Sequence, residues 1–160
     1  MRQNLGTALT VTATEKWLAA VQAGNAFGLY ASQNAVAAQF SYVQLYNPAA
    51  SGKTLLLRAV VGSTGAAAAI GFSMDNTQRT TDAGAGINLL SGAAAGVGHV
   101  RQETNAALQG AQFGSVLTAV GAAVIMPIEW FAQLAPGQGL TTYCTIVNIQ
   151  LVTWFLWTEA

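Results

Sequence analysis

The chain has 160 residues, of which 52% are hydrophobic, enough for one domain with a sizeable core. It carries only six basic and six acidic side chains and no net charge, whereas soluble proteins place charge on about a quarter of their residues. This composition excludes a disordered chain, which needs low hydrophobicity and high net charge, and it lacks the basic patch of a nucleic-acid binder.

The charged residues leave long gaps between them. No Asp, Glu, Lys or Arg occurs from Trp17 to Gly52, or from Trp130 to Thr158. Charge normally keeps a protein soluble and separate from its copies. We therefore expect much of the folded surface to be covered by identical copies, by a larger lattice or by lipid.

The N-terminal region predicts one short helix. Thr12 and Glu15 have the spacing of a capping box, which begins a helix, and Gly24 would end it. A strand over residues 9–14 is the alternative interpretation. On the helix, three apolar residues would share one face: Trp17, Leu18 and Val21.

Residues 25–39 show no clear period. We interpret residues 1–39 as an arm or short helix that packs on a neighbouring subunit. Residues 1–7 lack the apolar core of a secretory signal, so we expect synthesis in the cytosol.

From residue 40 onward the hydrophobic pattern has a period of two, which indicates strands. Turn formers separate the segments at intervals of about 8–12 residues, a spacing typical of an all-β sandwich or barrel. We predict an all-β sandwich or barrel over residues 40–160, with a loop or tightly packed segment at the Gly/Ala-rich residues 81–98. The expected strands are 40–47, 54–61, 67–74, 97–103, 112–120, 124–131, 141–146 and 149–158.

Two uncharged stretches, residues 111–128 and 140–158, approach the length of a membrane-spanning helix, which needs about 20 predominantly apolar residues. Two glycines and a proline interrupt the first stretch, and polar residues with a period of two interrupt the second. The sequence does not favour a helical membrane protein.

Residues 47–54 partly match a phosphate-binding loop. The match includes Gly52, Lys53 and Thr54, but Asn47 stands where the first glycine is required, and Pro48, which lacks an N–H, follows it. We interpret the segment as a polar hairpin loop.

Few residues could support catalysis or metal binding. His99 is the only histidine, and Glu103, four residues along a strand, would lie about 13 Å away. Asp75 with Asp82, or Glu103 with Glu129, could form a carboxylate pair, but their spacing does not argue for one. We interpret these side chains as scattered, solvated charges, and we expect no catalytic site, no metal and no cofactor.

Cys144 is the only cysteine, so no intrachain disulfide can form. It lies in an apolar stretch, and we interpret it as a small buried hydrophobe, not a reactive thiol.

Aromatic residues are the remaining candidates. Trp130-Phe131 and residues 154–157 could form a sugar-stacking platform, although aromatics at strand spacing more often belong to a core or an interface. Both faces of the last strand are bulky, which predicts burial in the sandwich centre or at a subunit contact. We expect the subunit or lattice interface to include Trp17, Leu18, Val21, Phe27, Tyr30, Trp130, Trp154 and Trp157.

Three segments resemble a known group of proteins. They are FSYVQLYNPAASGKTLLLRAVV (40–61), IEWFAQLAPGQGLTTYCTIVN (128–148) and VTWFLWTE (152–159). Together they are similar to small β-sandwich virion proteins of tailed bacteriophages. The resemblance implies a jelly-roll-like fold, no catalysis, and symmetric oligomers on a virion, with trimers favoured. Residues 1–39 have no counterpart in it.

The leading hypothesis is therefore a bacteriophage capsid decoration or cement protein, not an enzyme, made in the host cytoplasm and located in the virion. Its partners would be its own copies and other virion proteins such as the major capsid protein. One alternative is a phage tail, receptor-binding or carbohydrate-binding module. The other is a membrane β-barrel, which alternation and short turns allow.

Overall fold

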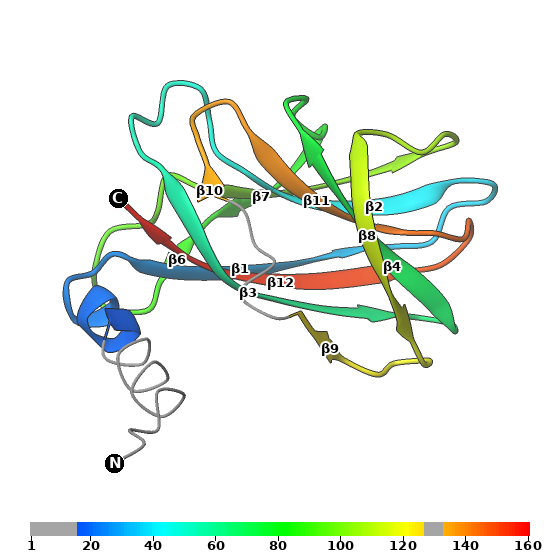
Figure 1. The fold of residues 1–160 in the computed structure, drawn as a ribbon, viewed down its shortest axis with the longest axis horizontal. Helices are drawn as coiled ribbons and strands as arrows, with labels where there is room; N and C mark the ends of the chain where they lie inside the picture. The colour runs from blue at the N-terminus through cyan, green and yellow to red at the C-terminus, as the bar shows by residue number, and fades with distance from the viewer. Residues whose placement is uncertain (1–15, 127–132) are drawn as a thin grey trace, which may run out of the picture.

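The computed structural model describes residues 16–126 and 133–160. These residues form two antiparallel β-sheets packed face to face, preceded by a short helix over residues 16–22 (Figure 1). The prediction of an all-β sandwich is confirmed.

Sheet A contains β1 (Ala26–Gln33), β3 (Leu55–Thr64), β6 (Ile87–Asn88), β9 (Val124–Ile125), β10 (Gln133–Leu134) and β12 (Leu151–Glu159). Its order is β10-β3-β12-β1-β6, and β9 also pairs with β3. The long strand β12 is central, so one of its faces lines the core and the other forms the outside of the sandwich.

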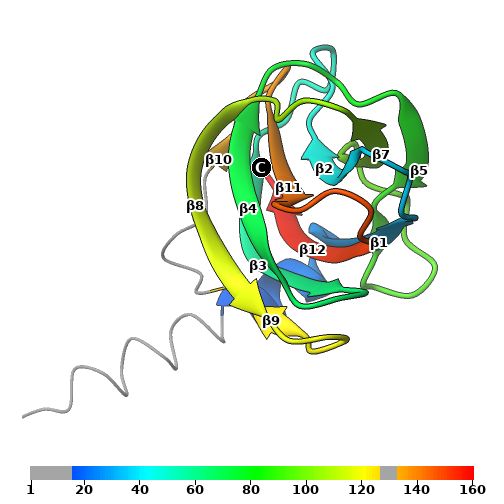
Figure 2. The same ribbon diagram turned by 90° about the vertical axis from the view of Figure 1, so that its right-hand side faces the viewer.

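Sheet B contains β2 (Phe40–Tyr46), β4 (Ala68–Asp75), β5 (Thr81–Ala85), β7 (His99–Asn105), β8 (Ala111–Thr118) and β11 (Gly139–Cys144). Its order is β5-β7-β2-β11-β4-β8. Strands β5 and β8 are therefore its two edges, and Figure 2 shows β8 as the outermost strand beyond β4.

The strand pairing is nested. β1 pairs with β12, β2 with β11, β3 with β10, and β4 with β8. The chain is thus one long antiparallel hairpin that has been rolled up, which brings β11 beside β4 and β12 beside β3 as well. This arrangement is a jelly roll, the topology that the resemblance of the three segments implies.

Residues 81–105, between β4 and β8, add three strands to the jelly roll. β7 and β5 extend sheet B beyond β2, and β6 extends sheet A beyond β1. Of the two alternatives expected for residues 81–98, a loop or a tightly packed segment, the loop is wrong where β5 and β6 form. β5 consists of small or polar residues and β6 has only two, Ile87 and Asn88, so backbone pairing and not side-chain burial defines these strands, and no hydrophobic period marks them.

The core lies between the sheets and is built from the inward residues of each strand. Trp157 is completely buried there, and its ring lies 6.1 Å from that of Phe27. Glycines make room for the indole, since a methyl group at Gly86 would overlap with it and one at Gly98 would come within 3.1 Å. Other fully buried members are Val43, Leu45, Leu55, Val60, Ile70, Leu140 and Phe155.

The sandwich begins earlier than the expected boundary at residue 40. Residues 26–33, expected in the arm, form β1 between β12 and β6, in register from Ala26 opposite Thr158 to Gln33 opposite Leu151. The strand mixes small and apolar residues on both faces, so it lacks the polar and apolar contrast that marks a half-buried strand.

The predicted helix is present over residues 16–22, and Gly24 follows it with a φ of +70°, as its predicted role at the helix end requires. The capping pair Thr12 and Glu15 and the alternative strand over residues 9–14 lie outside the described residues. So do residues 127–131 of the strand predicted over 124–131.

Cys144 is fully buried with a free thiol. Burial raises the pKa of this thiol, and a backbone hydrogen bond at Ile146 offsets part of the rise. The interpretation of Cys144 as a small core residue is confirmed, because a neutral, enclosed thiol is a poor nucleophile.

Candidate functional site

Charged side chains gather on the outer side of sheet B. On β2 and β7, residues alternate between core and exterior, so that Tyr42 lies opposite Glu103 and Gln44 opposite Arg101 on the outward face. The cluster holds five of the chain's twelve charged residues and its only histidine: Asp75, Arg79, Asp82, His99, Arg101 and Glu103. The expectation of scattered, solvated charges is therefore wrong for Asp75, Asp82 and Glu103, and Glu129 lies outside the described residues.

Arg79 is the centre of this cluster and is only 1% exposed. Its guanidinium pairs with Asp75, contacts the Gln109 amide, and lies 3.9 Å from Glu103 Oε1. It also lies 4.8 Å from the centre of the Tyr42 ring, in a cation–π arrangement. The charge of Arg79 is therefore balanced by groups of the chain itself.

Two connecting segments cover this face of sheet B. Residues 76–80 are held by Gln44, which donates to the Thr77 carbonyl at 3.0 Å and accepts from the Arg79 N–H at 3.0 Å. Residues 106–110 are held by the Tyr42 hydroxyl, which donates to the Ala107 carbonyl at 2.9 Å. Burial raises the pKa of Tyr42, partly offset by a backbone hydrogen bond and by the charge of Arg79.

Asp82 and His99 form the exposed part of the cluster. Asp82 Oδ2 lies 2.8 Å from His99 Nδ1 and 3.4 Å from Arg101. Partial burial alone would raise the pKa of Asp82, but hydrogen bonds from the Gly84 N–H and His99, with the charge of Arg101, lower it below its usual range. Within residues 16–126 and 133–160, no three His, Cys, Asp or Glu side chains are grouped as a metal site would require. The contacts of this cluster hold the fold together.

The segment that partly matches a phosphate loop, residues 47–54, is followed by strand β3 and not by the helix such a loop requires. It links β2 of sheet B to β3 of sheet A, so it is a polar loop between the sheets and not a hairpin loop. The buried Asn47 side chain donates to the carbonyls of Lys53 (2.8 Å) and Leu134 (3.0 Å). The segments 47–54 and 134–139 therefore meet at one end of the sandwich.

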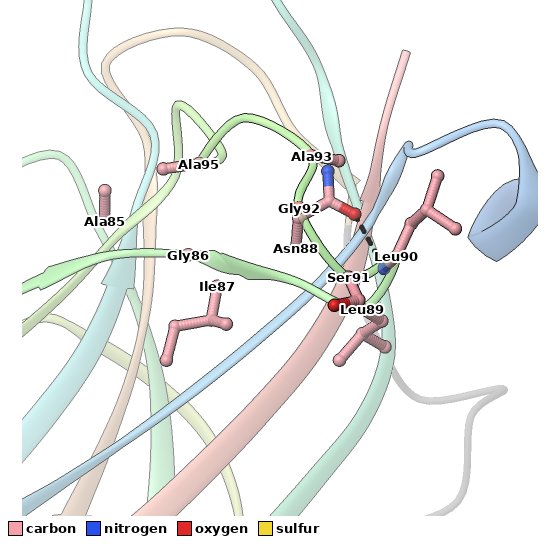
Figure 3. A pocket seen from close by; sticks show the side chains of 10 residues that line it. All are labelled: Ala85, Gly86, Ile87, Asn88, Leu89, Leu90, Ser91, Gly92, Ala93 and Ala95. Carbon is pink, nitrogen blue, oxygen red and sulfur yellow. Dashed lines mark hydrogen bonds between the residues drawn. The ribbon is translucent and has the colours of Figure 1, made fainter.

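A shallow cavity of about 590 Å³ lies beside the 85–95 segment (Figure 3). Its main polar group, the Asn88 amide, donates to the carbonyls of Gly24 and Ala94 and accepts from the Leu90 N–H. Because these bonds use the amide to shape the loop, the cavity lacks the convergent polar groups of a small-molecule site.

The residues predicted for an interface lie in different parts of the structure, some on its surface and some in its core. Trp17 and Val21 are half-buried and Leu18 is 54% exposed, all on the helix over residues 16–22. Trp130 lies outside the described residues.

Phe27 and Trp157 are core residues, and this is a correction. Each is buried between the sheets and offers no surface to a partner. On the same strands, Tyr30 lies three residues from Phe27, and Trp154 lies three residues from Trp157. Both therefore point outward, and they are 65% and 44% exposed. Three is an odd offset, and a strand places residues at odd offsets on opposite faces.

Tyr30 and Trp154 belong to a surface that we call the apolar face, on the outside of sheet A. Tyr30 lies opposite Trp154, Trp154 opposite Val61, and Val61 opposite Ile125, which makes one row across four strands. Ile87 extends the same side of the sheet through its pairing with Gly28. The exposed members are Tyr30 (65%), Ile87 (62%), Ile125 (71%) and Trp154 (44%).

Gly28 flattens this face. A methyl group at Gly28 would come within 2.9 Å of the Leu156 side chain and 3.2 Å of Trp154 Nε1. The glycine thus lets the large side chains of β12 lie across β1 and close the row into a continuous surface.

Sequence reasoning missed a second exposed apolar region, at β8 and the turn that follows it. Leu117 is 83% exposed, Val120 67% and Phe113 52%. A signal was present, because residues 104–126 carry no charge, like the two longer stretches noted above.

Comparisons with protein-family models, with curated proteins and with solved structures found no match to this chain. In the described parts of the chain, no helix has the length and apolar character needed to cross a membrane. The functional argument therefore depends on the exposed apolar residues.

Proposed function

We propose that this chain is a structural protein of a bacteriophage virion, a capsid decoration or cement protein that acts as a homo-oligomer. The apolar face carries the proposal, because its row of Tyr30, Trp154, Val61 and Ile125 contains no charge and is largely open to water in the single chain. Cores of protein interfaces are depleted of charge and enriched in Tyr and Trp, and this row has that composition.

The phage context comes from the resemblance of residues 40–61, 128–148 and 152–159 and is supported by the jelly-roll topology. Jelly rolls are frequent in viral capsid proteins, although a fold alone does not assign a function. The partners would be further copies and other virion proteins such as the major capsid protein. The proposal gives the chain no catalytic role and no cofactor.

The test of the apolar face is the native mass of the purified chain without detergent, by light scattering and native mass spectrometry. We expect a discrete oligomer for the wild type and its dissociation by Tyr30→Lys, which places a charge in the row. Ile146→Lys is the matched control, since Ile146 is 48% exposed on the loop between β11 and β12. A wild type that stays monomeric at high concentration contradicts the homo-oligomer.

The virion assignment needs a separate measurement. Mass spectrometry of purified particles of the encoding phage should detect the chain at a fixed copy number relative to the major capsid protein. Its absence from particles would remove the virion assignment and leave the assembly argument intact.

A carbohydrate-binding module is the second candidate, and the exposed pair Tyr30 and Trp154 favours it. Aromatic rings on a flat sheet can stack on sugar rings while their polar atoms contact water. Glycan-array binding that is lost in Trp154→Ala, with an unchanged native mass, would support this candidate over the first.

A further inference from the structure

The edges of the two sheets differ in how well they are protected. An edge strand presents unpaired N–H and C=O groups that can pair with another chain, and proteins limit this by short edges, charges, prolines or bulges. Sheet A ends in strands of only two residues, β6 on one side and β9 with β10 on the other. The β5 edge of sheet B has five residues, a bulge and Asp82.

β8, the other edge of sheet B, is less protected. It has eight residues, and the described residues around it, 104–126, contain no charge and no proline. A register shift at Phe113 interrupts it, but Gly114 to Thr118 pair regularly with β4. Among the described residues, the contacts that close the strand lie at its C-terminal end, where Thr118 contacts the Thr64 side chain and Val120 forms a β-bridge with Thr64.

The side chains of β8 add apolar surface to this open backbone edge. Leu117 is the most exposed large hydrophobic residue of the described chain at 83%, and Phe113, which packs beside Phe72 at 6.1 Å, is 52% exposed. A strand that combines free backbone groups with exposed apolar side chains is a template for another extended strand.

The absence of charge indicates which strand fits. Charged side chains on a partner strand would lose their hydration beside β8 and would find no opposite charge there. This desolvation costs free energy. A second copy of β8 brings an equally uncharged strand. We propose that two copies of the chain join by antiparallel pairing of β8 with β8, so that sheet B continues from one subunit into the next.

This inference rests on the proposed function, because it names the partner and the contact of the homo-oligomer. A contact of a strand with its own copy is two-fold symmetric. It therefore gives dimers or even-numbered assemblies, unlike the trimer that the resemblance implies. The apolar face of sheet A lies on a different surface and stays available for a second contact.

Leu117→Lys tests the contact in the full-length chain, because the residue is 83% exposed and its replacement spares the core. We expect the native mass of the wild type to be an even multiple of 16.5 kDa and the variant to have half that mass. Ile146→Lys, with a similar charge change away from β8, should keep the wild-type mass.

Hydrogen exchange provides an independent readout. Backbone pairing should slow alternate amides of residues 111–117 in concentrated wild-type protein, and Leu117→Lys or dilution should remove that protection. Equal exchange rates at both concentrations, or an unchanged mass of Leu117→Lys, would overturn the inference.

Other outcomes separate this inference from the proposed function. Stable trimers with freely exchanging β8 amides would refute the β8 contact and retain a homo-oligomeric virion protein. Protection of β8 only after addition of the major capsid protein would also refute it, because the occupant would be another protein. A monomeric wild type would refute both.

Discussion

The outer faces of the two sheets have opposite characters. Sheet B is covered by residues 76–80 and 106–110, beneath which Tyr42 and Gln44 are buried, and the Arg79 side chain of the first segment is buried with them. Sheet A has no such cover over Tyr30 and Trp154 among the described residues, and they remain exposed. One face is thus buried within the chain, whereas the other leaves its aromatic side chains exposed.

This contrast shows how the few charges are used. Five of twelve lie in the cluster on sheet B, where their contacts are largely with one another and with the backbone. They contribute little to keeping copies apart. The accessible surface is therefore even poorer in free charge than the residue count indicates, especially over sheet A and β8.

Arg79→Ala should give the largest effect, because it removes the buried cation of the charged cluster on sheet B. Breaking a buried ion pair typically costs about 3–5 kcal/mol, since the remaining charge is left unpaired. We expect a loss of this size in the free energy of unfolding, measured by urea denaturation. Lys53→Ala, at an exposed loop position, is the control. An effect as small as that of Lys53→Ala would mean that the cluster does not stabilise the fold.

Trp154→Ala tests the opposite face and should act on assembly more than on folding. Truncation of a central aromatic in an interface typically costs about 2 kcal/mol or more, which is about a thirtyfold rise in the dissociation constant between copies. Leu108→Ala provides a matched control on the cover of sheet B, because Leu108 is 43% and Trp154 44% exposed. Equal effects of the two variants would remove the distinction between the faces.

The sequence predicts the strands with a clear hydrophobic period well and the strands without one poorly. β2 and β3 have clear periods and turn formers between them, whereas β1 mixes small and apolar residues on both faces, β5 consists of small or polar residues, and β6 has only two residues. The order of nested strands could not be read from the pattern, because it depends on contacts between segments more than 100 residues apart, such as Phe27 with Trp157.

The candidate site was predictable in part. The odd spacing between Tyr30 and Phe27, and between Trp154 and Trp157, already requires that one member of each pair points inward. Which one does so depends on the partner sheet and not on residue type, because all four are large aromatics. The burial of Arg79 had no sequence signal either, since its neighbours Asn76 to Asp82 are polar, as in an ordinary surface turn.

Tyr42→Phe should have a smaller effect on the same side as Arg79. The substitution removes only the hydroxyl that donates to the Ala107 carbonyl at 2.9 Å. A hydrogen bond of this kind contributes about 1 kcal/mol to stability, so we expect a loss near that value and faster hydrogen exchange in residues 106–110. Tyr30→Phe, at an exposed hydroxyl on sheet A, should leave stability unchanged. A similar loss in both variants would show that the cover does not depend on this bond.

The smallest effect concerns Asp82, at the exposed rim of the cluster. Its pKa is lower in the folded chain than its ordinary value of 3.8, so the unfolded chain takes up the proton first as the pH falls. The stabilisation from the ionised carboxylate is therefore complete above pH 3.8 and disappears as the pH drops through the lower, folded value.

Urea unfolding from pH 6 to pH 2 should show wild type more stable than Asp82→Asn at pH 6, with the difference closing below pH 4. The difference should be small, since Asp82 is 40% exposed and water screens its contacts with His99 and Arg101. A difference that stays constant across the whole range would mean that the Asp82 charge contributes nothing to the stability of the fold.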